Sequence, residues 1–279
     1  MEAHVFLALL LAAALHAGWN SVVKLGLDRA STVLLLALVQ AIISIPLLPF
    51  VTQPATEALP WICVAAALHT GYKIFLVKAY ETADLSVAYP LARGTAPLIV
   101  TAFSVAFLGV VLPVTSLLAI VVISLGIFLM AAKGAATGRL AGRPLFFAIA
   151  TAAFTASYTL VDGIGARIAG TASGFILWMV VGDAVGMVVH ATWTRGTAAF
   201  PALLPAWKAG LAAGAMSLGS YWIAMWAFTQ APIALVAALR ESSILFAVLI
   251  AAFVIREPVS RWRWASAGAI AFGVALMKT

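Results

Sequence analysis

The sequence predicts an all-α integral membrane protein with ten transmembrane helices that form two inverted five-helix repeats. Of its 279 residues, 65% are hydrophobic and only 9% are charged, and the mean hydropathy is +1.12. A soluble domain of this length needs more polar surface than this composition supplies. The apolar residues also fall into runs long enough to cross a bilayer, which takes about 20 residues. A stretch of the first half recurs in the second half, as in transporters built by duplication.

The duplication is clearest between residues 79–88 and residues 227–236, which align without a gap at an offset of 148 residues. Each copy joins the end of one apolar run to the start of the next. Further aligned pairs are Leu91 with Leu239, Thr95 with Ser243 and, after a slip of one residue, Gly126 with Gly273, Leu129 with Leu276 and Met130 with Met277. We therefore expect residues 1–137 to form the first repeat and residues 138–279 the second, together making one integrated transport domain.

Ten apolar runs define the expected helices, and breakers separate most of them. In order, the runs are 3–23, 32–51, 58–79, 85–107, 113–132, 144–162, 172–193, 206–229, 233–254 and 262–278. The breakers are Pro54 with Pro60, Pro113, Gly134 to Pro144, Pro201 with Pro205, Pro232 and Pro258. The longest connection, 133–143, lies between the fifth and sixth runs, where two repeats should join. Because five is an odd number, the second repeat must enter the membrane from the opposite side, which predicts inverted repeats about an axis in the membrane plane.

Basic residues are distributed unevenly between the two sides of this topology. Loops after odd-numbered runs carry 11 of the 16 Lys and Arg residues, whereas the opposite side carries only Arg167 and Lys278. The positive-inside rule places the richer side in the cytoplasm, so both termini are expected outside. The N-terminus, Met1 to His4, lacks the basic region of a cleaved signal peptide, and the first run is therefore expected to remain as a helix.

Composition and missing motifs exclude several classes of function. The net charge of +7 is explained by loop residues that set orientation, and no nucleic-acid-binding signature accompanies it. The sequence contains no GxxxxGK[ST], HExxH or GxSxG motif, so we expect neither a nucleotide-driven pump nor an enzyme. Its four histidines are too scattered for a metal site, and the single Cys63 permits no intrachain disulfide. We expect no cofactor, a small-molecule substrate and a surrounding lipid bilayer; the sequence does not determine the oligomeric state.

Ionisable residues inside membrane runs are costly, so each is a candidate for function. They are His16, His69, Lys73, Arg93, Asp183, Arg240 and Glu241. His69 and Lys73 are four residues apart and share a helix face, with Tyr72 beside them. Asp183 lies between two glycines spaced four apart, so a role in close helix packing is an alternative to ligand binding.

Arg93 is the expected anchor for a substrate carboxylate, because a guanidinium binds a carboxylate through two parallel hydrogen bonds. Tyr89 shares its helix face, and two prolines in the same run predict an irregular helix around it. Glu241 aligns with Arg93 in the second repeat. A structural ion pair of Arg93 with Glu241 or with Asp183 is therefore the alternative to substrate binding.

The predicted substrate site combines polar, charged and aromatic side chains of several runs. The predicted substrate-binding residues are His69, Tyr72, Lys73, Tyr89, Arg93, Trp178 and Glu241. The cavity is expected between the repeats, lined by the third, fourth, eighth and ninth runs with aromatic residues of the first, sixth and seventh. The polar groups would supply hydrogen bonds, and Trp178 would supply a stacking surface.

Two other functions remain open at this point. An exporter of cationic drugs or metabolites needs an unpaired carboxylate in the membrane, for which Asp183 and Glu241 are candidates, although basic groups outnumber acidic ones in the runs. An intramembrane aspartyl protease would use Asp162 and Asp183 on successive runs. However, Val180 stands where the Gly-x-Gly-Asp motif of such proteases needs glycine.

Three segments of the sequence resemble the EamA family of the drug/metabolite transporter superfamily. These segments are His16-Ala17-x-Trp19-Asn20, the stretch 79–91 and Arg256-Glu257-Pro258-Val259-Ser260. Their order and spacing, with the five-plus-five layout, extend the resemblance over the whole chain, and it is strongest to the bacterial amino-acid exporters of the YddG type. The resemblance implies a secondary carrier of the bacterial inner membrane, with periplasmic termini, that exports amino acids or similar small metabolites by alternating access.

Overall fold

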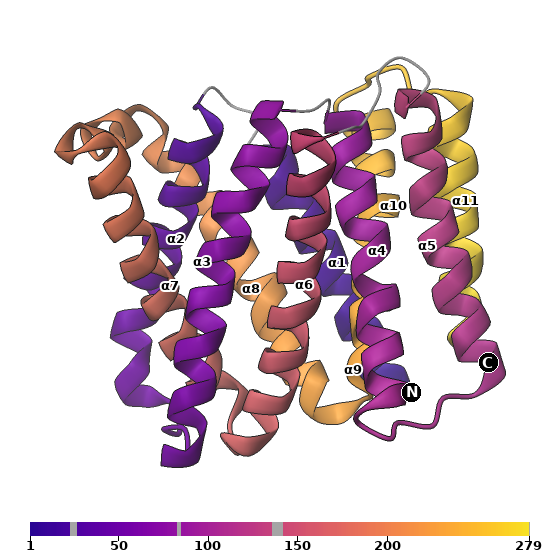
Figure 1. Cartoon of the computed structure of the whole chain (residues 1–279), viewed down its shortest axis with the longest axis horizontal. Coiled ribbons are helices and arrows are strands. Elements are labelled where there is room, and N and C mark those ends of the chain that lie inside the picture. Colours follow the sequence, from indigo (N-terminus) through magenta and orange to yellow (C-terminus); the bar gives the residue numbers. More distant parts are fainter. Residues whose placement is uncertain (23–26, 83–84, 136–141, 279) are drawn as a thin grey trace.

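The computed structural model describes the whole chain apart from residues 23–26, 83–84, 136–141 and 279. The described residues fold into helices that run between the two ends of one bundle, and they contain no strand (Figure 1). An all-helical fold suits this composition, because a helix satisfies its backbone hydrogen bonds internally, where lipid offers no partner. The predicted all-α fold is confirmed for this part of the chain.

The helices follow the apolar runs closely. The first half contains α1 (Ala3–Val22), α2 (Arg29–Leu47), α3 (Leu59–Thr82), α4 (Leu85–Ala106) and α5 (Val114–Ala135). The second half contains α6 (Arg143–Ile168), α7 (Ala172–Arg195), α8 (Trp207–Gln230), α9 (Ile233–Arg240), α10 (Ser243–Leu249) and α11 (Arg261–Leu276). Short helical pieces add η1 (Leu48–Phe50), η2 (Thr56–Ala58), η3 (Thr197–Ala199), η4 (Pro201–Ala206) and the π-helical η5 (Ile250–Val254).

Seven helical stretches of the described chain are long and apolar enough to cross a membrane. They are Ala3–Val22, Arg29–Phe50, Thr56–Ala79, Arg143–Ile168, Ala172–Arg195, Thr197–Gln230 and Ile233–Val254, and Val114–Met130 is a shorter apolar helix. The protein is therefore a multi-pass membrane protein, while the count of ten crossings stays a prediction.

Two helices differ from the expectation in where the backbone is irregular. α4 continues through Pro90 and Pro97, although each proline removes one backbone donor, because the surrounding turns keep their own hydrogen bonds. The irregularity occurs instead in the predicted run 233–254, where a two-residue turn separates α9 from α10. In that turn the N–H groups of Glu241 and Ser242 bond three residues back rather than four. The interrupted helix is thus the one that carries Glu241.

Polar side chains fix where α2 and α7 begin. Asp28 Oδ1 accepts a hydrogen bond from the N–H of Ser31 at 2.9 Å, and Thr171 Oγ1 accepts one from the N–H of Gly174 at 3.1 Å. Partial burial raises the pKa of Asp28, but the hydrogen bonds from Ser31 and the charge of Arg195 outweigh it. The pKa of Asp28 therefore lies below its ordinary value.

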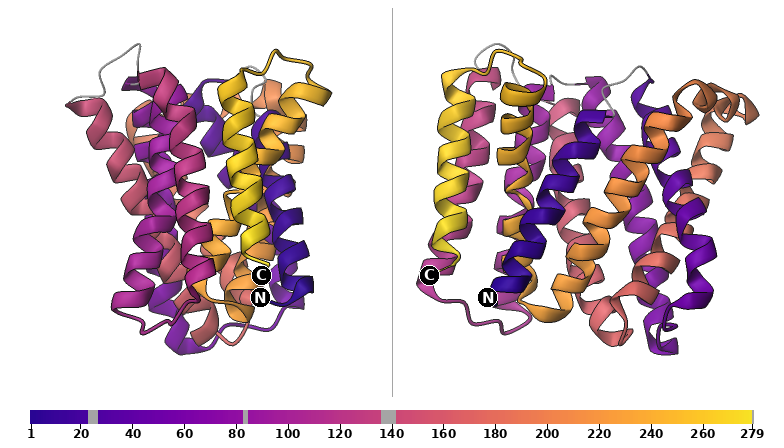
Figure 2. Two further views of the ribbon diagram at one scale, coloured as in Figure 1. Left: turned by 90° about the vertical axis from the view of Figure 1, so that its right-hand side faces the viewer. Right: turned by 180° about the vertical axis from the view of Figure 1, so that it is seen from behind.

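The helices pack in pairs that reproduce one another when the two halves of the chain are exchanged. The contact of α1 with α8 matches that of α6 with α3. In the same way, the contact of α2 with α8 matches that of α7 with α3, and the contact of α1 with α10 matches that of α6 with α4. Three further contacts join helices of the same position in each half, namely α2 with α7, α4 with α9 and α5 with α11. Figures 1 and 2 show α2 and α7 at one edge of the bundle, and α5 with α11 at the other.

The contact between α5 and α11 is built on glycine. Ser266 Oγ donates a hydrogen bond to the carbonyl of Gly126. On the facing helix, a Cβ added to Gly273 would lie 2.6 Å from Cγ1 of Ile123 and 3.0 Å from the carbonyl oxygen of Ala119. Gly126 aligns with Gly273, and Ala119 aligns with Ser266. The contact between Gly126 and Ser266 is therefore equivalent to the contact between Gly273 and Ala119.

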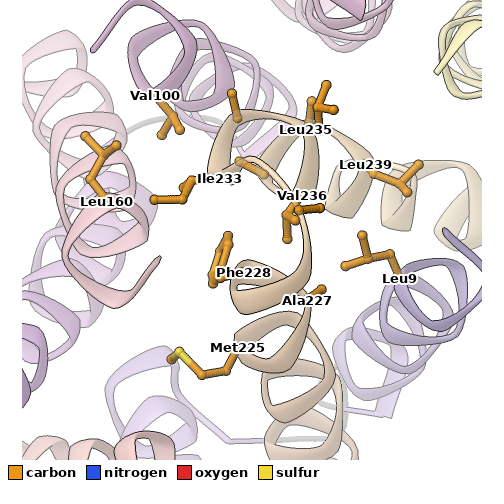
Figure 3. Packing of buried hydrophobic residues seen from close by; sticks show 14 of the residues in the cluster. Leu9, Val100, Leu160, Met225, Ala227, Phe228, Ile233, Leu235, Val236 and Leu239 are labelled. Carbon is orange, nitrogen blue, oxygen red and sulfur yellow. The ribbon is translucent and has the colours of Figure 1, made fainter. Parts of the chain in front are cut away.

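The two ends of the bundle differ in what they carry. Both termini lie at one end, with the connections α2–α3, α4–α5, α6–α7 and α8–α9, and we call it the terminal end (Figures 1 and 2). The connections α7–α8 and α10–α11 lie at the opposite end, which we call the loop end. Around the α8–α9 turn, Phe228, Ile233 and Val236 belong to one buried cluster with Leu9 of α1 and Leu160 of α6 (Figure 3). This apolar packing holds α1, α6, α8 and α9 together beside the site described next.

Candidate functional site

An open cavity of about 880 Å³ lies between α1, α6, α7 and α8, toward the terminal end. Its walls are formed by Ala8, Leu11, Ala166, Arg167, Gly170, Ala172, Ser173, Trp222, Ile223, Trp226, Thr229 and Gln230. This volume falls in the usual range of small-molecule sites, about 300–1,000 Å³. Of the runs expected to line the cavity, the third, fourth and ninth do not line this one, because α3 and α4 pack on other faces of α6.

The cavity walls combine aromatic surface with a few fixed polar groups. Trp222 and Trp226 are four residues apart, so they lie on one face of α8. Trp222 Nε1 donates a hydrogen bond to Ser173 Oγ at 2.8 Å, which fixes the indole ring against α7. Arg167 donates from Nε to the carbonyl of Phe228 at 2.9 Å and from Nη2 to a second carbonyl at the end of α8 at 2.8 Å. The walls therefore offer an organic solute mainly apolar contact.

Polar residues gather one helical turn inward from the cavity. Asp162 precedes the wall residue Ala166 by four positions on α6, about 6 Å along the helix axis. Asp162 is fully buried, and its Oδ2 accepts hydrogen bonds from His69 Nε2 at 2.9 Å and from the hydroxyl of Tyr221. Its Oδ1 has no partner among the described residues. A buried acceptor without a partner costs free energy, so Oδ1 marks a position where a bound group would be stabilised.

Aromatic and basic side chains enclose the Asp162–His69 pair. Tyr158, one turn from Asp162 on α6, stacks on His69 with ring centroids 4.2 Å apart. The guanidinium of Arg240 lies over the ring of Tyr221, 4.7 Å from its centroid. We call His69, Tyr158, Asp162, Tyr221 and Arg240 the polar cluster. It draws on α3, α6, α8 and α9, which is to say on both halves of the chain.

A buried ion pair joins Lys73 of α3 to Asp183 of α7. Thr70 Oγ1 also donates to Asp183 Oδ1 at 3.1 Å. The side chains of Lys73 and Asp183 are 13% and 2% exposed, so each charge depends on the other for neutralisation.

A second buried ion pair joins Arg93 of α4 to Glu241. Arg93 Nε donates to Glu241 Oε2 at 2.9 Å, and Nη2 donates to Ser243 Oγ at 3.1 Å. The two residues are 148 positions apart, the offset of the sequence duplication. A residue meets its own equivalent only near the axis that relates two similar units. Arg93 is engaged with these protein groups rather than turned to the cavity.

The structure brings together only part of the predicted substrate site. His69 lies in the polar cluster, and Tyr72 packs edge-on against Tyr158 with ring centroids 5.4 Å apart. Three predicted residues belong to the two ion pairs instead: Lys73, Arg93 and Glu241. The alternative reading of Arg93, an ion pair with Glu241, is the arrangement that the structure contains.

Trp178 lies apart from the other predicted site residues. It is 41% exposed, and its Nε1 donates a hydrogen bond to Gln53 Oε1 at 2.9 Å, because its face of α7 turns toward the α2–α3 connection. The side chain of Tyr89 lies outside the described part of the structure.

Sequence reasoning did not place Asp162, Tyr221 or Arg240 in the substrate site. The predicted run 144–162 ends on Asp162, a residue that the sequence suggests only as one carboxylate of the protease alternative. α6 continues to Ile168, and Asp162 thus lies about 9 Å inside the helix end. Tyr221 gives no sequence signal beyond being a polar aromatic residue in an apolar run. Arg240 stands out in the sequence as an ionisable residue of a membrane run, but nothing in the sequence assigns it to the substrate site.

The two aspartates of the protease alternative are held by different partners. Asp162 is bound by His69, whereas Asp183 is bound by Lys73, one turn further along α3. An aspartyl protease requires two carboxylates that share one proton, so this geometry gives that alternative no support. Among the described residues, no group of three His, Cys, Asp or Glu side chains could hold a metal ion.

Comparison with known proteins supports a transporter. Residues 4–132 match the model of the EamA-like transporter family, which confirms the family resemblance for this part of the chain. No curated protein matches the chain. One solved structure, described only as the crystal structure of a protein, matches with a TM-score of 0.72 and 15% sequence identity, covering 99% of this chain and 97% of that chain. At this identity the likeness shows the fold alone, and the amino-acid exporter subtype stays a prediction.

Proposed function

We propose that this protein is a secondary carrier of the bacterial inner membrane that exports amino acids or similar small metabolites by alternating access. The order of features along α6 carries the proposal. The cavity wall at Ala166 leads inward to Asp162 and Tyr158, and then to Phe154, whose ring packs on Phe75 of α3. An open cavity, a polar binding region and a closed layer, in that order, are what a carrier that faces one side of the membrane requires. The match of residues 4–132 to a transporter family supports the same class.

The carrier is built, in this proposal, from two inverted repeats of five helices, residues 1–137 and 138–279. The exchange pattern of the helix contacts supports a two-fold relation between the halves. The Arg93–Glu241 pair, which joins equivalent positions, supports an axis through the middle of the bundle. Because each repeat has an odd number of helices, this axis lies in the membrane plane.

The loop end faces the cytoplasm in this proposal, and the cavity faces the periplasm. The basic residues Arg195, Arg256 and Arg261 lie at or beside the loop-end connections, in keeping with the positive-inside rule. A cysteine placed in 255–260 should resist an impermeant thiol reagent in intact cells. The background should carry Cys63→Ser, because Cys63 is exposed. Labelling in intact cells would contradict this orientation and would place the loop end outside the cell.

An aromatic layer closes the path on the loop-end side of the polar cluster. Phe75 of α3 packs against Phe154 of α6 with ring centroids 5.0 Å apart. Gly71 makes room for the Phe154 ring, since a Cβ at Gly71 would overlap it. The equivalent residue on α8 is Gly219, where a Cβ would meet only Leu15 Cδ1, at 3.8 Å. The α3–α6 contact is thus more closely packed at Gly71 than the α1–α8 contact is at Gly219, as expected when two inverted repeats hold different local states.

The polar cluster favours a substrate that carries both signs of charge. Arg240 supplies a cation over the ring of Tyr221, and Asp162 supplies a carboxylate at the hydroxyl of the same residue. His69 and Tyr72 remain in the proposed site as hydrogen-bonding groups. Lys73, Arg93 and Glu241 act in this proposal as structural ion pairs.

Counterflow in proteoliposomes tests this function. Purified protein is reconstituted, loaded with one unlabelled amino acid at a time and assayed for uptake of the same labelled compound, with protein-free liposomes as the control. Accelerated exchange of at least one amino acid is expected. Exchange of organic amines without exchange of any amino acid would establish the cationic alternative, which the unpartnered Oδ1 of Asp162 favours. Exchange of neither class would contradict the proposal.

A further inference from the structure

The charges inside the bundle balance in number, but they do not all form ion pairs. The cations are Lys73, Arg93 and Arg240, and the carboxylates are Asp162, Asp183 and Glu241. Two of the cations and two of the carboxylates neutralise each other directly. Among the described residues, Arg240 forms no salt bridge. It follows Leu239 and precedes Glu241, and that neighbouring carboxylate is used by Arg93.

Tyr221 separates Arg240 from the remaining carboxylate. The guanidinium of Arg240 lies over the ring face, and the hydroxyl of the same ring donates to Asp162 Oδ2. A stacked guanidinium uses its flat face for the ring and keeps its N–H donors at its edge. Among the described residues no hydrogen bond from the Arg240 guanidinium is present, so its N–H donors can serve a second group.

Arg240 is also accessible in a way that Arg93 is not. Arg240 is half-buried, whereas Arg93 is only 7% exposed. The aromatic partner of Arg240, Tyr221, directly precedes the cavity-wall residue Trp222 on α8. Arg240 itself does not line the cavity, but the ring that it covers belongs to the residue next to a cavity-wall tryptophan.

The depth of Arg240 excludes a role as an interfacial anchor. It is the eighth residue of the stretch Ile233–Val254, about 10 Å along the helix from Ile233. A basic residue that sets membrane orientation lies in a loop or at a helix end facing water. A guanidinium at this depth without a direct salt bridge is costly, and such residues mark binding sites in membrane proteins.

We propose that Arg240 binds the carboxylate of the transported substrate, so that the carrier selects compounds with a free carboxylate. This inference rests on the proposed function and names the chemistry of its site. The substrate carboxylate accepts two hydrogen bonds from the N–H edge of Arg240. An amino group on the same molecule turns toward Oδ1 of Asp162, the acceptor that lacks a partner. Arg240 thereby takes the role that the sequence predicts for Arg93.

The test measures selectivity between an amino acid and its carboxamide. The amino acid that the wild-type carrier exchanges fastest is compared with its amide, which has the same side chain and amino group but no carboxylate. The wild type should prefer the amino acid, in kcat/KM, by roughly 10- to 100-fold, the value of hydrogen bonds to a charged group. Arg240→Gln should bring this ratio close to 1, and Arg240→Lys should give an intermediate ratio because a point charge replaces the fork.

A matched control separates this role from a structural one. Arg240→Gln breaks no ion pair among the described residues, so its melting temperature in detergent should stay close to that of the wild type. Arg93→Gln, in contrast, should melt lower because it leaves Glu241 unpaired. An Arg240→Gln carrier that keeps the wild-type ratio would overturn the inference. If that variant does not fold, an unchanged ratio in Arg240→Lys would overturn it. A wild type that exchanges no amino acid would overturn the proposed function, and this inference with it.

Discussion

Of the three contacts that join helices of the same position in each half, α5–α11 and α4–α9 are built in different ways. The α5–α11 contact uses like residues in both halves, with Gly126 and Gly273 each facing the other helix. The α4–α9 contact uses residues of opposite charge, with Arg93 Nε 2.9 Å from Glu241 Oε2. Both contacts join helices of the same position in the two halves. The difference between them therefore reflects the residues that meet there, which are glycines in one contact and charges in the other.

Geometry explains why one contact keeps like residues and the other does not. Small residues at equivalent positions let the two helix backbones approach closely, and a glycine on either helix has the same effect. If both halves carried the same charged residue at equivalent positions near an axis, the two like charges would face each other. Two arginines or two glutamates there would repel in a low dielectric. A charged pair on the axis therefore requires the two halves to diverge, and this divergence also makes the interior of the bundle asymmetric.

The largest expected effect comes from breaking the charged contact. Arg93→Gln should lower the free energy of unfolding by about 3–5 kcal/mol, because Glu241 would be left as an unpaired buried charge. The double variant Arg93→Gln/Glu241→Gln should recover most of that loss. Melting temperatures of the two proteins in detergent, measured at neutral pH, check the prediction. Equal losses in the single and double variants would show that the charges do not act as a pair.

The apolar contact should respond to added volume rather than to charge. Gly273→Leu should cost about 1–3 kcal/mol, since its Cβ alone would lie 2.6 Å from Ile123 Cγ1. Gly268→Leu on the same helix is the matched control, because a Cβ there meets nothing within 4 Å. Thermal unfolding of both variants measures the difference. Similar melting temperatures would contradict a close α5–α11 contact.

A third pair of equivalent positions sharpens the comparison between the two sides of the bundle. Gly71→Ala should destabilise by roughly 1 kcal/mol or more, because the added methyl group must displace the Phe154 ring. Gly219→Ala should be neutral or stabilising by about 0.5–1 kcal/mol, since alanine favours a helix and the space is free. Chemical or thermal denaturation of the two variants gives the sign of each change. Equal effects would remove the asymmetry from which we infer a closed layer on the α3–α6 side.

The smallest effect concerns the N-caps of the equivalent helices α2 and α7. Asp28→Ala should cost about 1 kcal/mol at neutral pH, as for other N-cap substitutions. The pKa of Asp28 is lowered in the folded protein, so its stabilisation is full above the unfolded pKa and disappears as pH falls through the folded pKa. The melting temperatures of wild type and Asp28→Ala should therefore converge only as the pH falls below 3.8, the ordinary pKa of an aspartate. Thr171→Ala should show a loss that does not vary with pH, because a hydroxyl does not titrate there.

Part of the candidate site could be read from the sequence because the membrane makes charge conspicuous. His69 and Arg93 stand out in apolar runs, and both lie inside the bundle. Their roles could not be read in the same way. Glu241 is 148 positions from Arg93 and Asp183 is 110 positions from Lys73, so no local spacing encodes either pair. Trp178 was chosen for its place in a run, but its face of the helix is set by packing.

The sequence alone determined the helices and the duplication. A bilayer demands about 20 apolar residues per crossing and internal backbone hydrogen bonding, and both demands act locally along the chain. Tertiary structure decided which charges neutralise each other, which arginine forms no salt bridge among the described residues and where the cavity opens. These depend on which helix faces meet, and a helix face is chosen by packing among all its neighbours rather than by its own sequence.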